Sequence, residues 1–329
     1  MVISMHITAL SLALAAASSA LLGPAAAAVP VAAHATSTAP AAPVPAPGDD
    51  DSTSCTEPAQ VLDLSNWKVT LPFGGAGNAK SPLEVKQPEL ANYGTAPWFN
   101  PTPACDAVVF RAPVDGVTTK GSRNPRSELR EMVDNGASTA SWSSTAGTHM
   151  LTVTEAFTHL PVGKPELVGA QIHDADDDIT VFRLEGSNLY ITEGDNPHYK
   201  LVTSNYALGT KFEARYVVRD GKVNVYYNGA LQTTISNRFS GAYFKAGAYT
   251  QANCGNSSPC SSSNYGETTI YNVSVFHHVT PWDIFWEWFT RTLPLAMAAA
   301  VLIAVGWLGW RRARTQPAFS LPRFGRSPK

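Results

Sequence analysis

Short runs in which apolar and polar residues alternate dominate the chain between about residues 55 and 279. Alternation with a period of two is typical of strands, because successive side chains point to opposite faces. Asp220-Gly221 and Asn228-Gly229 are strong hairpin turns. No segment here shows a sustained helical period, so an all-β sandwich, jelly roll or barrel is expected. The predicted strands cover residues 67–71, 107–111, 149–157, 179–184, 189–192, 211–218, 222–227, 231–235 and 268–276.

Three further stretches, 126–130, 171–173 and 243–251, have a polar face whose residue types suggest chemistry. If their strands lie side by side in one sheet, these faces converge on one surface. The residues that would meet there are Arg126, Glu128, Arg130, Gln171, His173, Tyr243, Lys245, Tyr249 and Gln251. Tyr243 is interpreted as a structural aromatic, since tyrosine favours sheets in any case.

The two ends of the chain have different patterns from the middle. Residues 1–35 are predicted to be a signal peptide, because an apolar stretch precedes Ala-x-Ala-like sites, although no Lys or Arg opens it. Residues 36–54 are rich in Ala, Pro, Ser, Thr and Asp, which predicts a disordered linker. The globular domain is expected over 55–279.

The C-terminal segment resembles a membrane anchor. Residues 292–310 are 19 uncharged residues, and a helix of that length spans about 30 Å, the thickness of the hydrocarbon core. Tryptophans flank the run and Arg311, Arg312 and Arg314 follow it. The positive-inside rule predicts a single-pass protein with an extracellular body, a juxtamembrane segment and transmembrane helix over 280–310, and a basic cytoplasmic tail over 311–329. A buried core helix is the alternative.

Charge and cysteine content narrow the possible partners. The formal net charge is −2, but the last 19 residues carry six Lys or Arg, which leaves 18 basic against 26 acidic residues elsewhere. An acidic body without a basic stripe argues against nucleic acid as a partner. The four cysteines suggest two disulfides in an exported chain, with three possible connectivities. Pairing of Cys55 with Cys105 and of Cys254 with Cys260 is the simplest, and no metal site is predicted.

The polar surface lacks the carboxylate pair that most glycosidases need. Its one acid, Glu128, lies between two arginines and is expected to be ionised and to orient its neighbours. The acidic run at 174–178 is interpreted as a solvated loop. β-Elimination on a uronic acid, by contrast, needs a base, an acid and donors that neutralise the carboxylate. A His, a Tyr, an Arg and a Gln supply these parts without a cofactor.

The same segments carry a family resemblance. Arg-Ser-Glu-Leu-Arg-Glu at 126–131, Gln-Ile-His at 171–173 and Tyr-Phe-Lys-Ala-Gly-Ala-Tyr-Thr-Gln at 243–251 resemble the signature segments of polysaccharide lyase family 7, the alginate lyases. Residues 62–72 resemble that family's opening, and the likeness covers about 55–279. It implies a β-jelly roll whose concave sheet forms the substrate groove.

The resemblance also assigns roles to single residues. It implies that His173 is the base and Tyr249 the acid, with Tyr249 serving as both for one C5 epimer. Gln171 and Arg126 would neutralise the carboxylate. The groove would be lined by Glu128, Arg130, Lys245 and Gln251.

The leading hypothesis is therefore a membrane-anchored, extracellular alginate lyase without a cofactor, with a monomeric ectodomain. One alternative is a lyase for another polyuronate such as glucuronan. Another is a carbohydrate-binding jelly roll at the cell surface that has lost catalysis. A glycoside hydrolase is disfavoured for want of a carboxylate pair.

Overall fold

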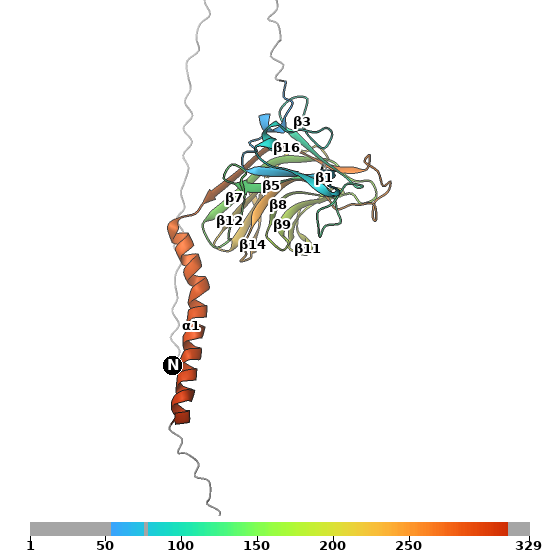
Figure 1. Ribbon diagram of the computed structural model, residues 1–329. Helices are drawn as coiled ribbons and strands as arrows, with labels where there is room; N and C mark the ends of the chain where they lie inside the picture. Colours follow the sequence, from blue (N-terminus) through green and yellow to red (C-terminus); the bar gives the residue numbers. More distant parts are fainter. Residues whose placement is uncertain (1–53, 76–77, 315–329) are drawn as a thin grey trace, which may run out of the picture. The chain divides into compact units, whose positions relative to one another are not determined.

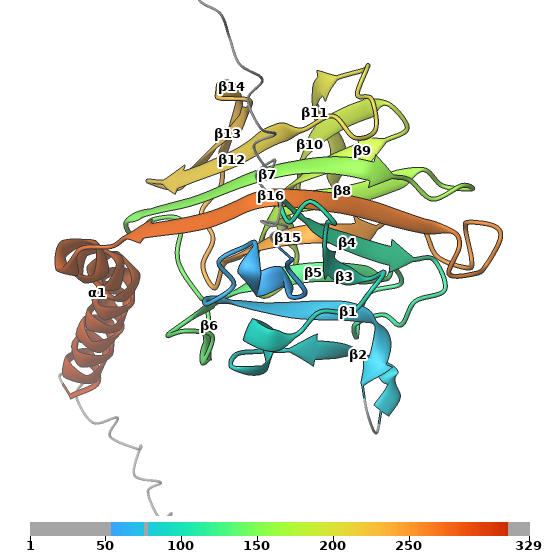
Figure 2. The same ribbon diagram turned by 90° about the horizontal axis from the view of Figure 1, so that it is seen from above.

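Two antiparallel sheets form the body of the protein in a computed structural model that describes residues 54–75 and 78–314. The sheets stack face to face, and Figure 2 shows β7 and β16 of one sheet across from β8 and β15 of the other. The expected all-β sandwich is confirmed.

The first sheet has nine strands in the order β11-β10-β9-β8-β15-β5-β1-β2, with β6 paired to β5. Figure 1 labels β1, β5, β8, β9 and β11 of this sheet. Its strands are β1 (Trp67–Gly75), β2 (Asn78–Val85), β5 (Arg126–Val133), β6 (Ser138–Thr139), β8 (Glu166–His173), β9 (Asp178–Glu185), β10 (Asn188–Glu193), β11 (Asn196–Thr203) and β15 (Tyr243–Thr250).

The second sheet has seven strands in the order β14-β13-β12-β7-β16-β4-β3. Its strands are β3 (Phe99–Pro101), β4 (Val108–Pro113), β7 (Thr148–His159), β12 (Phe212–Arg219), β13 (Lys222–Tyr227), β14 (Ala230–Ser236) and β16 (Tyr265–His278). Two short 3-10 helices, Pro58–Gln60 and Glu89–Asn92, precede β3.

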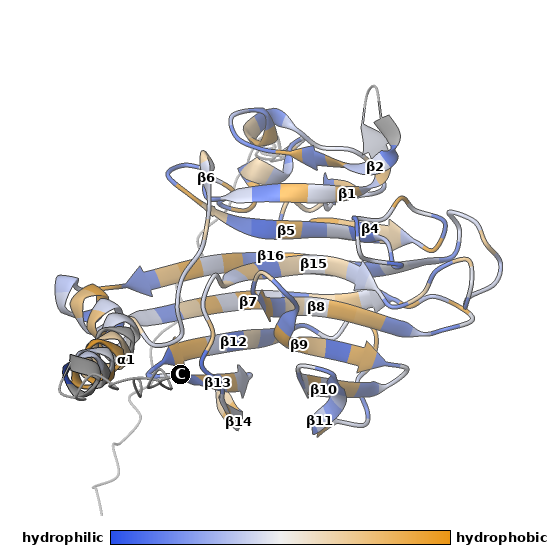
Figure 3. Ribbon diagram, turned by 60° about the horizontal axis from the view of Figure 1, so that its bottom comes forward, coloured by the Kyte–Doolittle hydropathy of each residue, from blue (hydrophilic) through white to orange (hydrophobic). Residues whose placement is uncertain are grey.

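The core fills the space between the sheets, and alternation along the strands supplies it. In β12, Phe212, Ala214, Tyr216 and Val218 are buried while the residues between them are more exposed. Hydrophilic and hydrophobic bands alternate along the strands in Figure 3. One face of each sheet is thus committed to the core, which leaves the other face of the first sheet available for polar side chains.

Two disulfides join Cys55 to Cys105 and Cys254 to Cys260. This is the simplest of the pairings that the sequence allowed. The first ties the start of the body to the loop before β4, and the second joins two cysteines six positions apart in the loop after β15.

The C-terminal segment forms helix α1 (Pro281–Arg314). In residues 54–75 and 78–314, however, no helix combines the length and apolarity needed to cross a membrane, and the predicted transmembrane helix is not supported. The predicted signal peptide (1–35), nearly all of the linker (36–54) and most of the basic tail (311–329) lie outside the described residues.

Candidate active site

The three polar stretches are neighbours in the first sheet, because β15 lies between β8 and β5. Cross-strand pairs on one face of an antiparallel sheet bring their side chains together. Tyr243 is opposite His173, and Tyr249 is opposite Arg126. Lys245 is opposite Arg130 on one side and Gln171 on the other. The pairing register therefore assembles residues that lie more than a hundred positions apart in the chain.

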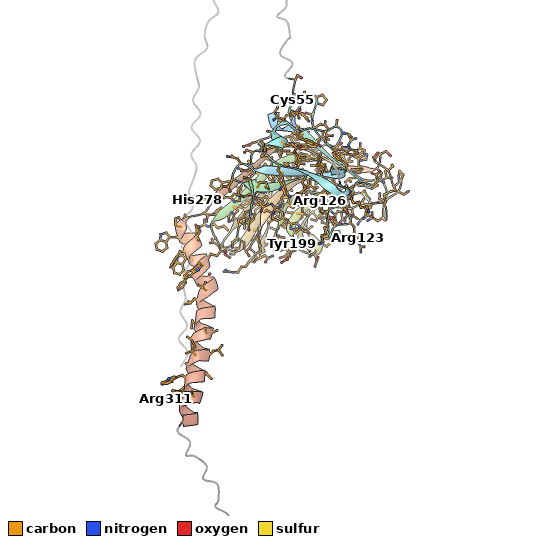
Figure 4. The ribbon with its side chains drawn as sticks, viewed as in Figure 1. Cys55, Arg123, Arg126, Tyr199, His278 and Arg311 are labelled. Carbon is orange, nitrogen blue, oxygen red and sulfur yellow. A yellow bond between two sulfur atoms is a disulfide. The ribbon has the colours of Figure 1, made fainter. Side chains whose placement is uncertain are left out.

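These side chains line one open cleft of about 440 Å³. Seven of the eight predicted site residues border it, and Gln251 does not. The loop at 119–122 and the acidic loop at 175–178 form its rims. Figure 4 labels Arg126, at the start of β5, and Arg123, in the loop ahead of it. The predicted residues in the cleft are Arg126, Glu128, Arg130, Gln171, His173, Lys245 and Tyr249.

Glu128 is the common acceptor of the site. Its side chain is 1% exposed, and it accepts hydrogen bonds from Arg126 Nη1 at 3.0 Å, from Lys245 Nζ and from Gln171 Nε2. Burial alone would raise the pKa of Glu128, but the charges of Lys245 and Arg126 outweigh burial and lower that pKa. An ionised Glu128 therefore holds three donors in place, which is the orienting role that the sequence suggested.

Lys245 is also buried, with 6% of its surface exposed. Burial lowers the pKa of Lys245 to about 8, against the opposing pull of Glu128. One of the two cations thus balances the charge of Glu128, and the guanidinium of Arg126 leaves the cluster with an excess positive charge near neutral pH. An anionic substrate group would be attracted to that charge.

His173 is held in a defined orientation. Its ring stacks on Tyr243, with centroids 5.3 Å apart, and the Tyr243 hydroxyl lies 3.2 Å from Nδ1. Nδ1 is also 2.6 Å from the carbonyl oxygen of Asp174, which can only accept, so we assign the ring proton to Nδ1. Burial, followed by the charge of Lys245, lowers the pKa of His173. The imidazole is thus neutral near pH 7, and its Nε2 lone pair is available as a base.

Tyr249 lies beside the positive cluster. The Arg126 guanidinium stacks over its ring at 4.0 Å from the centroid, and its hydroxyl is 3.2 Å from Ser122 Oγ. Arg126 also has an unsatisfied hydrogen-bond donor, because its buried Nε has no hydrogen-bond partner among the described residues. A buried donor without a partner is costly unless a ligand satisfies it.

Gln251 lies in an adjoining pocket instead. There Gln251 Oε1 accepts a hydrogen bond from Arg183 Nη1 at 3.3 Å. The pocket shares Gln171, Tyr249 and Asp178 with the main cleft, so the two are continuous. Arg183 is itself paired with Glu166 and Glu185.

Two residues that take part in the site, Ser122 and Arg183, had no signal in the sequence. Ser122 precedes β5 in a loop, and Arg183 is in β9 beyond the signature segments. Tyr243, interpreted as structural, stacks on both His173 and the Arg130 guanidinium, the latter at 3.8 Å. Their roles depend on contacts between strands, which no local pattern encodes.

Comparison with known proteins decides the family. A family model described as alginate lyase matches residues 62–277. The chain belongs to the alginate lyase family. The residues that the family model matches include strands of both sheets, so the family domain coincides with the body described above.

Solved alginate lyases have the same fold. The alginate lyase from Corynebacterium sp. is 63% identical, covers 68% of this chain and 99% of its own, and gives a TM-score of 0.66. The alginate lyase AlgAT5 of polysaccharide lyase family 7 is 45% identical over 68% and 99% of the two chains, with a TM-score of 0.64. A search of curated proteins found no match. The chain is thus a polysaccharide lyase of this family, and the family resemblance is confirmed.

Proposed function

We propose that this lyase cleaves alginate by β-elimination at the 4-O-glycosidic bond and leaves an unsaturated uronate at the new end. The observation that carries the proposal is the cleft that gathers a neutral, anchored imidazole, a tyrosine hydroxyl and an arginine N–H without a hydrogen-bond partner in residues 54–75 and 78–314. The names of the similar structures, which are alginate lyases, support alginate as the substrate.

In the proposed reaction, Arg126 and Gln171 neutralise the uronate carboxylate, so that charge can flow into it as the C5–H bond breaks. Glu128 orients both donors through its hydrogen bonds. His173 Nε2 takes the C5 proton as general base. The C4–C5 double bond forms as the C4–O4 bond breaks, and Tyr249 gives its proton to the leaving oxygen.

The direct test is to incubate the wild-type protein with alginate and to follow the ultraviolet absorbance. The absorbance should rise as the C4–C5 double bond forms. We expect His173→Ala and Tyr249→Phe to lower kcat/KM by at least about 10³-fold, because each removes a proton-transfer group. The melting temperature of each variant should show that the fold persists.

Matched controls come from the outer strand β11. His198→Ala and Tyr199→Phe change exposed residues of the same types and should retain activity. Absence of absorbance with alginate and with glucuronan would refute the lyase proposal. Reducing ends without absorbance would indicate hydrolysis, and binding without turnover would indicate a carbohydrate-binding protein. Products from separated poly-mannuronate and poly-guluronate would give the block preference.

An extracellular location is part of the proposal. The two disulfides support it, since disulfides persist in oxidising compartments. The single-pass membrane location and the monomeric ectodomain stay predictions of the sequence. Fractionation of cells expressing the full chain checks the first: activity that pellets with membranes and needs detergent for release supports it, and activity in the medium contradicts it.

A further inference from the structure

Strand β8 is irregular just before Gln171. Val168 and Gln171 are three positions apart in β8. Their partners are only two positions apart in β9, where they are Arg183 and Val181. In β15 the partners, Tyr249 and Lys245, are four positions apart. Gly169 and Ala170 lie within this irregular step, and we call them the β8 bulge. Bulges next to active sites commonly re-aim a side chain.

The β8 bulge changes which residues face the substrate. In a regular strand, residues three apart point to opposite faces. Here Val168 and Gln171 both line the polar face, while Leu167, Ala170 and Ile172 belong to the core. The irregular step thus resets the alternation ahead of Gln171 and His173. A slip of one residue would turn both of them into the core.

Two side chains from the opposite sheet satisfy the backbone of Ala170. Its N–H donates to Glu155 Oε1 at 3.3 Å, and its carbonyl accepts from the Tyr216 hydroxyl at 3.0 Å. Glu155 is in β7 and Tyr216 in β12, and both are fully buried. Figure 2 shows β7 and β12 side by side in the sheet that covers β8. These bonds connect the second sheet to the strand that carries the base.

Glu155 also occupies the space beneath Gly169. A Cβ atom on Gly169 would lie 2.7 Å from Glu155 Oε1 and 2.8 Å from Oε2, so a side chain there would force the Glu155 carboxyl to move. Burial raises the pKa of Glu155 to about 8, which keeps the carboxyl neutral near pH 7. The nearby titratable groups are the phenols Tyr206 and Tyr216, whose pKa is raised first by burial and then by Glu155. Oε2 has no hydrogen-bond partner in the described part of the chain.

A buried carboxyl that makes one long hydrogen bond is a poor source of stability, because its desolvation cost is large. The contacts of Glu155 with the β8 bulge indicate a role in positioning that strand. We propose that Glu155 and Tyr216 are positioning residues, which hold the β8 bulge from the opposite sheet and so aim Gln171 and His173 into the cleft. The catalytic part of this inference rests on the proposed function above.

The sharpest test compares two buried tyrosines. Tyr216→Phe removes the donor to Ala170, whereas Tyr206→Phe removes a hydroxyl that bonds Thr210 and Phe157 away from β8. Both variants should lose similar stability. We expect kcat to fall at least about tenfold in Tyr216→Phe with KM nearly unchanged, since small misplacements of catalytic groups are costly in rate. Equal kcat values for the two variants would overturn the proposal.

Glu155 offers a rescue experiment. Glu155→Gln keeps an acceptor for the Ala170 N–H and should retain kcat at pH 7 to within about threefold, while Glu155→Leu should lose at least about tenfold. If Glu155→Leu does not fold, the tyrosine pair still decides the matter. A Glu155→Gln variant as impaired as Glu155→Leu would contradict the proposed role of the hydrogen bond.

Hydrogen exchange separates this inference from the proposed function. Amides of residues 167–173 should exchange faster in Tyr216→Phe than in wild type, and no faster in Tyr206→Phe. This readout needs no turnover, so an inactive wild-type protein would refute the proposed function and leave the bulge testable. Unchanged exchange in Tyr216→Phe would refute the positioning role.

Discussion

At the scale of single residues, the site is organised by Glu128 rather than by the residues proposed to react. It is the acceptor for Arg126, Lys245 and Gln171 while itself almost fully buried. The sequence showed an acid between two arginines and so suggested its ionised state. It could not show that Lys245 and Gln171 share the same carboxylate, because these contacts cross two strand boundaries.

Loss of Glu128 should therefore damage the whole cluster. We expect Glu128→Ala to lower the free energy of unfolding by about 3 kcal/mol or more, because the buried Lys245 and the half-buried Arg126 lose their partner. Glu84→Ala is the control, since Glu84 forms a more exposed ion pair with Lys68 at 2.7 Å, and such pairs contribute about 1 kcal/mol or less. Urea unfolding measures both, and equal losses would contradict the role of Glu128.

The pH dependence of activity belongs to the same scale. A general base acts in its deprotonated form, and burial lowers the pKa of His173. On the acidic side, kcat/KM should therefore rise with pH through a pKa below about 6.5, the usual value for histidine. Initial rates between pH 4.5 and 8 would measure it, with His198→Ala as a control that keeps the same profile. An acid limb above 6.5 would argue against His173 as the base.

At the scale of elements, β15 is the strand on which the site depends, because it pairs with both other site strands. Gly247 lies between Lys245 and Tyr249 with φ +148, and a Cβ there would lie 2.5 Å from the carbonyl oxygen of Ser127 in β5. That backbone region is essentially restricted to glycine. Close contact between β15 and β5 thus requires a residue without a side chain at this point.

Gly247→Ala should consequently destabilise the protein by at least about 2 kcal/mol, from backbone strain and overlap together, and should lower activity through its neighbours. Gly209→Ala also has positive φ, at +85, but nothing lies within 4 Å of the added Cβ. It should cost only about 1 kcal/mol. Thermal unfolding distinguishes the two, and a smaller loss at Gly247 than at Gly209 would show that β15 and β5 separate easily.

At the scale of the whole molecule, charge is distributed unevenly. Outside the last 19 residues the chain carries 18 basic and 26 acidic residues, whereas the cleft is lined by five of each. Its basic residues are Lys68, Lys120, Arg126, Arg130 and Lys245, and its acidic residues are Glu84, Glu128, Asp176, Asp177 and Asp178. The cleft is therefore less acidic than the rest of the body. An acidic protein that binds a polyanion must concentrate positive charge where the substrate lies.

Salt should therefore weaken binding. We expect KM for alginate to rise severalfold between about 0.05 and 0.5 M salt, because exposed charges are screened over that range. Lys120→Glu, at the rim of the cleft, should raise KM at low salt, whereas Lys222→Glu in β13 of the other sheet should change it little. A KM that does not depend on salt would contradict electrostatic attraction by the cleft.

The local sequence pattern predicted most central strands, the family segments and their shared polar face, since burial of one sheet face imposes alternation along each strand. It missed β2 and β11, which lie at the edges of the first sheet, and the short strands β3 and β6. In β11, exposure on both faces removes that alternation.

Only the tertiary structure decided how the polar residues meet. The stacking of Tyr243 on His173, the contact of Ser122 with Tyr249 and the support of Ala170 by Glu155 depend on strand order, register and the packing of two sheets. Alternation specifies which face a residue takes, whereas partners across strands follow from pairings between distant segments, and these exist only once the chain has folded.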